Sequence, residues 1–497
     1  MNFSVNFPLF SIILCLLCSV ISSILSEKRA RLLSLALCLA VCLMSLCLLG
    51  HGIATGTETS YIMGHHPHPW GNEIRFGILE PMLVSLFSFI MFLSLIGGER
   101  QLARDLHEGK QNLYYVLTDL ILVALTALTY TNDIFTGYVF VEICTISSCG
   151  ILMIREIGRT TLAAIRYMIF SLIGSGLFLL GTILLYGITG QLLMPDLKAA
   201  IALLWESGSF HTQLITAICL ISSGLAIKSG LFPFHLWMPD TYGYSTPCSS
   251  CILSGLVSKG YIVLLIKAIF CVFGTGVFYS SGMQNVFFGL GILGMVFGSL
   301  SAIKENDIFR MSAYSSAAQI GYIYMGIGIS PTTGMAAAVF HIMTHAITKP
   351  LIFLSAAQLS DAAGGKHFKD LQGIGHTAHL AGGAFTIGAL SMVGIPFTMG
   401  FISKYLFAVS AFRTDEKCPL ILAALAVSTL LNVYYFMRTV IRLYQPAAPD
   451  EAAPESRVHT PSLPYMASAV IMIIMNIGGG IFSRMFIEWI NAGLGML

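Results

Sequence analysis

Apolar runs of about 20 residues recur along almost the whole chain. An α-helix of that length spans the ~30 Å hydrocarbon core of a bilayer and satisfies its own backbone hydrogen bonds there. Only 10% of the 497 residues are charged, whereas a soluble domain carries about 25%. The sequence therefore predicts an all-α integral membrane protein, with residues 1–497 forming a single membrane domain.

The apolar runs, with the Gly and Pro residues that separate them, predict about fourteen membrane-spanning helices. The expected ranges are 8–25, 31–50, 77–98, 113–131, 134–154, 164–188, 212–238, 249–273, 283–303, 309–330, 334–356, 378–409, 419–443 and 463–488. The seventh and twelfth ranges are over-long and interrupted. The first range has no basic residue before it and no small-residue cleavage site, so we expect a membrane helix and not a removed signal peptide.

Lysine and arginine are concentrated in every second loop of this arrangement, beginning with the loop after the first helix. Basic loops stay on the cytoplasmic side of a membrane. We therefore expect a multi-pass protein of the cell membrane with both termini outside. The net charge is only +2 and no basic cluster occurs, so we expect contact with the lipid bilayer and no nucleic-acid partner.

Histidine and cysteine form no complete metal-binding pattern. The segment Gly64–Trp70 holds three histidines, but no Cys or carboxylate is spaced to complete a four-ligand site, so we expect an ordered Pro-rich outer loop. Cys248 and Cys251 form a lone CxxC pair, and most of the 12 cysteines lie inside apolar runs and should pack as small apolar residues. We expect no metal, no cofactor and no catalytic centre in this chain.

Two of the expected helices are interrupted in a similar way. Residues 228–234 read KSGLFPF, and residues 394–404 read GIPFTMGFISK. Interrupted helices at corresponding places in two halves indicate a transporter built from an internal repeat. We expect two five-helix units, residues 113–273 and 283–443. The lysine precedes the break in one half and follows it in the other, which suits an inverted repeat; two unrelated proline kinks are the alternative.

Charged side chains inside the apolar runs are the candidate functional residues, because an uncompensated charge in a membrane costs about 2.5–3.5 kcal/mol or more. Glu142 lies near the middle of the fifth helix, and Lys228 of the same unit is its natural partner. The alternative is a purely structural ion pair. Lys259 lies about one turn into the eighth helix, where burial favours the neutral amine and allows it to release a proton. Lys267 is expected to extend to the outer interface.

The eleventh helix carries His341, His345 and Lys349 at intervals of four residues, which places them on one helix face. Histidine titrates near neutral pH, so this stripe predicts a proton wire. Histidines hydrogen-bonded to backbone in a packed core are the alternative. Lys404 closely follows the second break, and Asp240 is expected in a cytoplasmic loop that orders the first break.

These residues belong to segments that resemble a known family, the antiporter-like subunits shared by respiratory complex I, energy-converting membrane hydrogenases and Mrp-type Na⁺/H⁺ antiporters. The similarity covers the third to the thirteenth expected helix. It rests on YVFVEI, GLAIKSGLFPFHLWMPDTY, SKGYIVLLIK, NDIFRMSAYSSAAQIGYI, FHIMTHAITKPLIFLS and GIPFTMGFISKYL. The resemblance implies fourteen helices with two inverted five-helix bundles, each containing a broken helix.

The resemblance also implies roles for individual residues. The characteristic glutamate of the family falls on Glu142, its broken-helix lysine on Lys228, its central lysine on Lys259 and its outlet residue, glutamate in some relatives, on Lys404. The residues that match the family's eleventh-helix stripe are His341, His345 and Lys349. Gln319 stands where some relatives carry a histidine. The chain stops after the fourteenth helix without a long lateral helix, which favours a D-type Mrp-like subunit or its hydrogenase counterpart.

Three functions follow from this pattern. The first is a proton-translocating subunit of a multi-subunit Mrp-type cation/proton antiporter, with other hydrophobic subunits as partners and Na⁺ as a second candidate ion. The second is a proton- or sodium-pumping subunit of a redox complex, a membrane-bound hydrogenase or NADH/quinone oxidoreductase, whose redox chemistry would belong to partners. The third is a stand-alone secondary transporter, which a lysine-rich path without a substrate pocket disfavours.

The expected mechanism is a proton relay. A proton enters from the cytoplasm near the interrupted seventh helix, reaches Lys228 and Lys259, passes the His345 region to Lys404, and exits outside. Pairing with Glu142 favours the ammonium form of Lys228, and withdrawal of Glu142 releases the proton.

Overall fold

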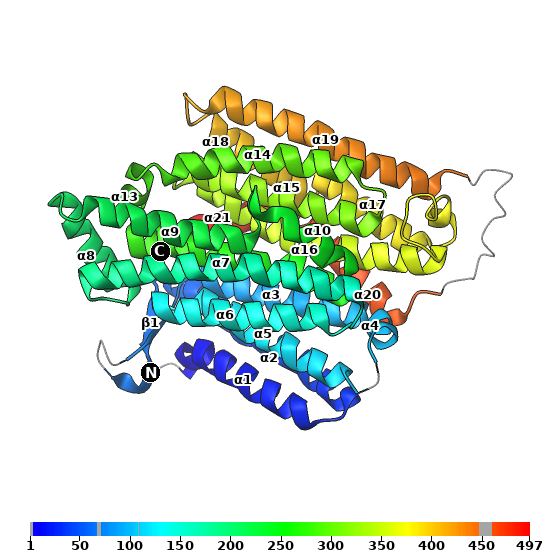
Figure 1. The fold of residues 1–497 in the computed structure, drawn as a ribbon, viewed down its shortest axis with the longest axis horizontal. Helices are drawn as coiled ribbons and strands as arrows, with labels where there is room; N and C mark the ends of the chain where they lie inside the picture. The colour runs from blue at the N-terminus through cyan, green and yellow to red at the C-terminus, as the bar shows by residue number, and fades with distance from the viewer. Residues whose placement is uncertain (1–2, 67–70, 108, 447–459) are drawn as a thin grey trace.

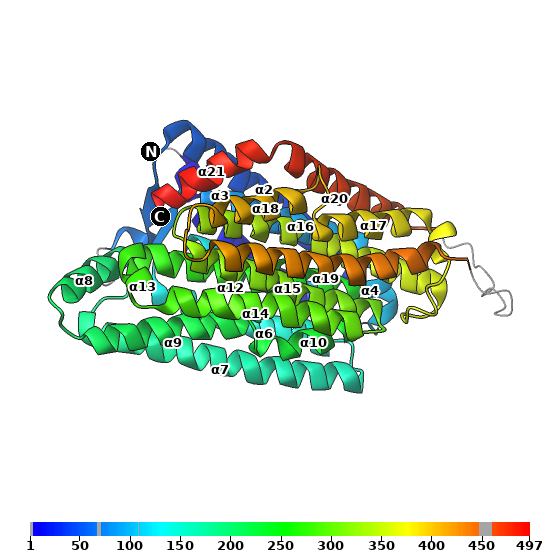
Figure 2. The same ribbon diagram turned by 90° about the horizontal axis from the view of Figure 1, so that it is seen from above.

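The structure, a computed structural model, describes residues 3–66, 71–107, 109–446 and 460–497. Long helices lie side by side and make up nearly the whole molecule (Figure 1, Figure 2). The predicted histidine loop lies partly outside the described residues, at positions 67–70.

The N-terminal part combines helices with a short hairpin. Its helices are α1 (Phe7–Ile24), α2 (Glu27–Thr55), α3 (Leu79–Gly97), α4 (Glu99–Asp105) and α5 (Gln111–Tyr130), with 3₁₀ turns at Phe3–Asn6 and Met63–His65. Strands β1 (Thr59–Ile62) and β2 (Glu73–Phe76) pair antiparallel, with Thr59 opposite Phe76. The sequence did not predict this hairpin, because four-residue strands are too short to give a clear alternating pattern.

The central part contains the first broken helix. Its helices are α6 (Ile134–Met153), α7 (Gly158–Thr189), α8 (Met194–Glu206), α9 (His211–Ser229), α10 (Met238–Tyr244), α11 (Pro247–Ile252), α12 (Ser258–Lys267) and α13 (Thr275–Ser280). A 3₁₀ turn covers Phe234–Trp237, and π-helical turns cover Leu253–Val257 and Ala268–Phe273.

The C-terminal part contains the second broken helix. Its helices are α14 (Met283–Lys304), α15 (Ile308–Ile329), α16 (Thr333–Ala363), α17 (His379–Val393), α18 (Met399–Ala411), α19 (Cys418–Tyr444), α20 (Leu463–Ile481) and α21 (Ser483–Met496), with a 3₁₀ turn at Ile374–His376. Both termini lie at the end of the molecule that carries α8 and β1 (Figure 1).

The predicted number of spanning segments is confirmed. Twelve helical stretches of the described chain are long and apolar enough to cross a membrane. The 22-residue α15 is also long enough to span, and the short apolar pair α17 and α18 completes one further span. These make fourteen segments.

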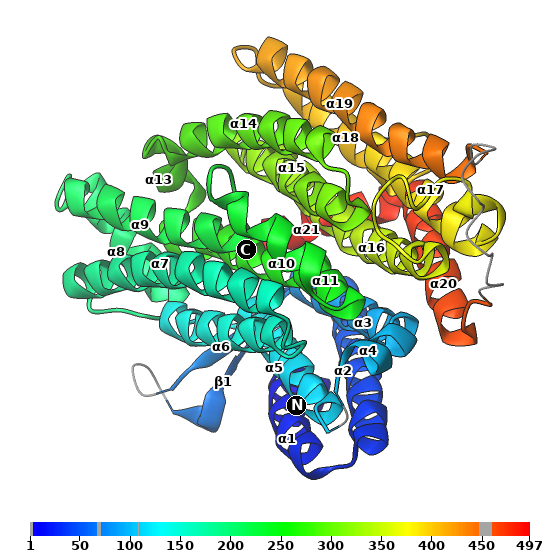
Figure 3. The same cartoon turned by 45° about the vertical axis from the view of Figure 1, so that its right-hand side comes forward.

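Burial separates central helices from peripheral ones. The apolar windows of the Pro247–Phe273 stretch and of α16 are 100% buried, whereas those of α1, α7 and α19 are 39% buried. The exposed faces of the peripheral helices carry large apolar side chains such as Leu172 and Leu430, as lipid-facing or subunit-facing surfaces do. Figure 3 shows α16 passing through the middle of the assembly, beside α15 and α11.

Both predicted breaks are present. The α9 helix ends in Gly230, which adopts a left-handed conformation with φ 81°, and the chain becomes helical again at Phe234. The α17 helix ends in Gly394 with φ 94°, and α18 begins after Thr398, whose side chain accepts a hydrogen bond from the Phe401 backbone N–H. Each Gly takes a conformation that residues with a Cβ rarely adopt. The two interruptions are therefore specified by the local sequence, through the glycine at each break.

Candidate functional site

The first break places Lys228 beside Glu142. Lys228 is in the last turn of α9, and Glu142 is in the middle of α6. The Lys228 Nζ lies 3.5 Å from Glu142 Oε1 and donates a hydrogen bond of 2.6 Å to Thr145 Oγ1. A cation at a helix C-terminus is favoured by the unpaired carbonyls there. The expected ion pair is therefore formed.

Close helix packing fixes the stem of Lys228. A Cβ on Gly174 of α7 would lie 2.9 Å from Lys228 Cγ and 2.8 Å from the Gly224 carbonyl oxygen. The Lys228 ammonium also lies 5.6 Å from the centre of the Tyr261 ring, within cation–π range. Tyr261 is on α12, so this ring connects the first break with the helix that carries Lys259.

Lys259 is held by a distorted turn of its own helix. The π-helical turn Leu253–Val257 ends immediately before α12 begins. The Lys259 ammonium donates hydrogen bonds to the Ser254 carbonyl and, at 3.4 Å, to Ser258 Oγ. Ser254 is inside this π turn, so the turn supplies the carbonyl that accepts from a fully buried lysine.

The stripe of His341, His345 and Lys349 on α16 faces the same region. Lys349 donates to the Ser312 carbonyl at 2.8 Å and to Ser315 Oγ at 2.7 Å, both on α15. Lys259 and Lys349 are both fully buried. His345 is one turn from both Lys349 and His341, and its ring centre lies 6.4 Å from that of His341. A row of buried titratable groups therefore begins at Lys259 and continues along α16.

The row ends at the second break. His341 Nδ1 is 2.6 Å from Ser403 Oγ of α18. The next residue of α18 is Lys404, whose ammonium donates to the Val393 carbonyl at 2.6 Å and to Thr429 Oγ1 at 3.2 Å. Val393 is the last residue of α17, so the break supplies the carbonyl that binds the lysine.

Several buried polar atoms along this row have no hydrogen-bond partner within the described protein. They are His341 Nε2, His345 Nδ1 and Nε2, the Gln319 amide atoms Nε2 and Oε1, and Tyr322 Oη. Tyr322 stacks on His341 with 5.4 Å between ring centres, and the Lys404 ammonium lies 5.7 Å from the Tyr322 ring centre. Buried polar groups in proteins bond to protein or to ordered water. These atoms are therefore the points along the row at which ordered water would bind.

The residues predicted from the sequence fall into two groups. Glu142 and Lys228 form one, and Lys259, His341, His345, Lys349 and Lys404 form the other. In the described part of the chain, no direct hydrogen bond joins Lys228 to Lys259. The hydroxyl-bearing residues that hold these side chains were not predicted: they are Thr145, Ser258, Ser315, Ser403 and Thr429. Thr145 is one turn from Glu142 and could have been found from that spacing.

Asp240 differs from its expected position, because it lies in the short helix α10 and not in a loop. Its carboxylate forms ion pairs with Arg166 of α7 and Arg310 of α15. The α10 segment of the broken helix is thereby tied to both halves of the protein. Tyr244, the last residue of α10, lines a pocket of about 180 Å³ together with residues that include Ser245 and Asp361.

Lys267 also differs from its expected position. It was expected to extend to the interface, but it is only 1% exposed. Its ammonium donates to the carbonyls of Thr129 at 2.8 Å and Thr131 at 2.6 Å. The end of α5 supplies these acceptors, which the sequence of α12 alone could not reveal. Among the residues that the structure describes, no group of three or more His, Cys, Asp or Glu side chains could hold a metal ion.

Comparison with known proteins gives a consistent family. Residues 131–431 match the family described as NADH:quinone oxidoreductase/Mrp antiporter, TM. The chain is 32% identical over 434 residues to the N subunit of the NADH-quinone oxidoreductase of Desulforudis audaxviator, covering 87% of this chain and 85% of the relative. It is 27% identical over 380 residues to the D subunit of the Na(+)/H(+) antiporter of Alkalihalophilus pseudofirmus, covering 76% and 74%.

Two solved structures share the fold. A chain of the Mrp complex from Dietzia sp. DQ12-45-1b superimposes with a TM-score of 0.87 at 20% identity, covering 100% of this chain and 97% of that chain. A chain of the membrane-bound sulfane sulfur reductase, an archaeal respiratory membrane complex, gives 0.85 at 23% identity, covering 99% and 96%. The resemblance inferred from the sequence motifs is confirmed. Because the family match spans more than half of the chain, this protein belongs to the transmembrane family of NADH:quinone oxidoreductase and Mrp antiporter subunits.

Proposed function

We propose that the chain is a proton-translocating, antiporter-like subunit of a multi-subunit membrane complex. The observation that carries this proposal is the set of titratable side chains inside the bundle, which comprises the buried Lys259, His341, His345 and Lys349 and the partly buried Lys404 at the second break. Titratable groups inside a membrane mark ion and proton pathways. A purely structural Glu142–Lys228 ion pair would not require these additional titratable side chains.

The entry for protons is proposed on the side of the bundle where α10 lies. The pocket of about 180 Å³ there is lined by Ser245, whose hydroxyl lies 2.8 Å from that of Ser250. Further along the same stretch, the Ser254 hydroxyl lies 2.9 Å from that of Ser316. The Ser254 carbonyl accepts from Lys259. Hydroxyls at this spacing can pass protons with bridging water.

The exit is proposed at Lys404. This side chain lines an open groove of about 540 Å³ between α18 and α19, together with Tyr405 and Thr429. The proton would move from Lys259 to the His345 region and His341, and from there to Lys404. Lys404 would then release its proton into the groove, which opens away from the core.

The Glu142–Lys228 pair is proposed as the switch. When the carboxylate pairs with the ammonium, the proton stays on Lys228; when the carboxylate is withdrawn, the buried amine loses its compensation and releases the proton. The Glu142 side chain is 23% exposed, whereas Lys228 is 1% exposed. A neighbouring subunit could therefore reach Glu142 with an alternative cation.

We also infer the internal organisation and the orientation. Residues 113–273 and 283–443 would form two inverted five-helix units, because each contains one broken helix with a lysine beside the break. Both termini would lie outside the cell membrane, which places the α10 pocket on the cytoplasmic side. The distribution of basic loop residues supports this orientation.

The finer proposal is a D-type subunit of an Mrp cation/proton antiporter. The similarity to the Na(+)/H(+) antiporter relative and to the fold of the Mrp complex supports it. Other hydrophobic subunits would be its partners, since the solved structures that share the fold are chains of multi-subunit membrane complexes.

The second candidate is the ion-pumping subunit of a redox complex. The relative from NADH-quinone oxidoreductase favours it, with higher identity over more of the chain. In that case the redox chemistry belongs to partner subunits, and this chain contributes only the ion path.

Gentle purification from the native membrane, followed by mass spectrometry of all co-purifying chains, tests these proposals. Several small hydrophobic subunits without redox centres would support the Mrp antiporter. Co-purifying iron–sulfur, nickel or flavin subunits would support the redox complex. A protein that is purified alone and still transports cations would contradict both.

A further inference from the structure

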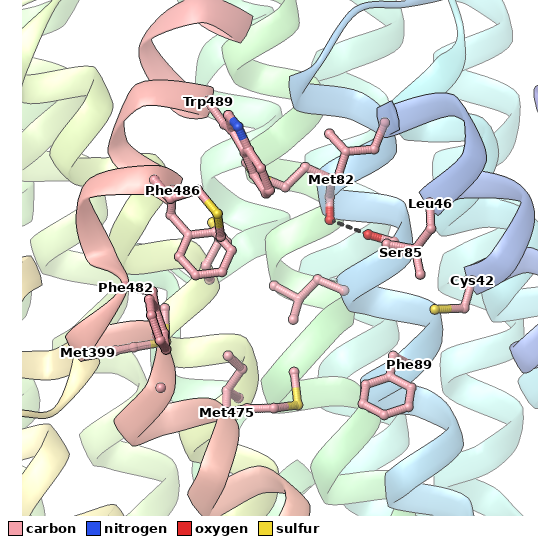
Figure 4. A pocket seen from close by; sticks show the side chains of 17 residues that line it. Cys42, Leu46, Met82, Ser85, Phe89, Met399, Met475, Phe482, Phe486 and Trp489 are labelled. Carbon is pink, nitrogen blue, oxygen red and sulfur yellow. Dashed lines mark hydrogen bonds between the residues drawn. The ribbon is translucent and has the colours of Figure 1, made fainter. Parts of the chain in front are cut away.

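An apolar cavity of about 490 Å³ is lined on α16 by Met343 and Ile347, which are two residues away from the stripe residues His341 and His345 and so lie on a different face of that helix. It is enclosed by α2, α3, α16, α18, α20 and α21, and Figure 4 shows side chains from α2 and α3 facing those from α20 and α21 across it. The proton path described above uses none of these side chains.

The chemistry of the wall defines what can bind inside. The lining consists mainly of Met, Leu, Ile and aromatic side chains. Its one hydroxyl, on Ser85, is already used, because it donates to the Met82 carbonyl at 2.9 Å (Figure 4). Methionines such as Met82, Met399 and Met475 adapt their shape to an irregular apolar ligand. The occupant must therefore be hydrocarbon along its buried length.

The mouth of the cavity is exposed at the surface of the described chain, beside Arg484 and its ion-pair partner Glu488. Leu46, Phe482 and Met485 line the cavity and are 47%, 64% and 40% exposed. Phe482 and Met485 also line a second, shallow surface pocket that contains Arg484. The Arg484 side chain is 92% exposed, and its contact with Glu488 is an exposed i,i+4 ion pair, which contributes little. Its guanidinium is therefore available to bind a phosphate.

The junction of two helices lies at the cavity mouth, because α20 ends at Ile481 and α21 begins at Ser483. Arg484 is therefore in the first turn of α21. Phe486 and Trp489 line the cavity further along α21, and aromatic residues favour the membrane interface.

We propose that a bilayer phospholipid binds here, with one acyl chain in the cavity and its phosphate at Arg484. The acyl chain would contact Met399, the first residue of α18, and Met343 on α16. The lipid would thus form part of the wall that supports the second break. This inference rests on the cavity and its mouth, and it stands independently of the proposed function.

Gly478 offers a direct test, because it lines the cavity and a Cβ there meets nothing within 4 Å. Gly478→Phe fills the cavity from one wall. Gly176→Phe is the matched control, since Gly176 is a helical, exposed glycine of α7 with the same open surroundings. The probe is a phosphatidylglycerol with a diazirine halfway along one acyl chain, photolysed in membranes that contain the full complex. Mass spectrometry then locates the adducts.

Adducts on the α20–α21 and α2–α3 peptides that disappear in Gly478→Phe and persist in Gly176→Phe would support the proposal. Arg484→Gln, a surface change that does not threaten folding, should reduce these adducts about fivefold, the effect of one basic residue at an anionic membrane surface. Adducts that are equally strong in Gly478→Phe would overturn the proposal, as they would reflect only lipid around the protein. An isoprenoid quinone that co-purifies with the wild type and is lost in Gly478→Phe would also overturn it, as would a partner helix cross-linked to the cavity in place of lipid.

Discussion

Glu142 and Lys228 form an ion pair with unequal exposure: their charged atoms lie 3.5 Å apart, the ammonium is buried, and almost a quarter of the carboxylate side chain is accessible. Loss of one partner from a buried pair leaves an uncompensated charge. A neighbouring subunit can draw away the accessible carboxylate of Glu142, and the buried ammonium of Lys228 then loses its compensating charge. This asymmetry is what a switch requires.

Glu142→Gln keeps the size of the side chain but removes its charge. Without the carboxylate, the buried ammonium of Lys228 loses its compensating charge and the neutral amine is favoured. Proton transport by the complex should therefore fall at least about tenfold. Transport is measured in inverted membrane vesicles with a pH-sensitive dye. The exposed Glu206, changed to Gln, is the control, and equal rates in the two variants would contradict the switch.

Lys228→Ala removes the buried amine and leaves Glu142 partly exposed. Transport should fall at least as much as in Glu142→Gln, and the double variant should lose no more than the single ones, because both changes interrupt the same step. The measurement is a double-mutant cycle on the transport rate. Independent, multiplicative losses would show that the two residues do not act as a unit.

Gly174 and Gly176 form a matched pair on α7. Leu at Gly174 would collide with Lys228 Cγ and the Gly224 carbonyl, whereas Leu at Gly176 would enter open space. Gly174→Leu should destabilise the fold by about 1–3 kcal/mol and impair transport, while Gly176→Leu should do neither. Thermal unfolding in detergent and vesicle transport measure the two effects. Similar melting temperatures would show that the α7–α9 contact is looser than described.

Asp240→Asn weakens the ties from α10 to Arg166 and Arg310. Because the Arg166 side chain is half exposed, the expected cost is only about 1 kcal/mol. Faster hydrogen exchange should therefore be confined to α10 and the start of α15, with the exposed Asp415→Asn as control. Unchanged exchange in α10 would show that packing alone holds this segment.

Much of the fold could be predicted from the sequence. The fourteen segments follow from run length, and the two breaks follow from Gly230 and Gly394, whose backbone conformations are local properties. The candidate lysines and histidines were visible because charged residues are rare in apolar runs. Their positions in the chain needed no tertiary information.

Other features depend on contacts between distant segments. Lys267 looked like an interfacial residue, but the carbonyls at the end of α5 hold it inside. The π turn before Lys259 and the helix containing Asp240 arise from packing that no short pattern encodes. The apolar cavity lies among six helices far apart in sequence, so its lining residues looked like ordinary core.

The central claim is that protons pass through the buried row that begins at Lys259. The most direct measurement is the proton-transport rate of the purified, reconstituted complex with Lys259→Ala, driven by a Na⁺ gradient or by the electron donor of any co-purifying redox subunits. The exposed Lys198→Ala is the control. We predict a loss of at least about tenfold in Lys259→Ala with the complex fully assembled, and no loss in the control. An assembled Lys259→Ala complex that transports protons at the wild-type rate would contradict the account.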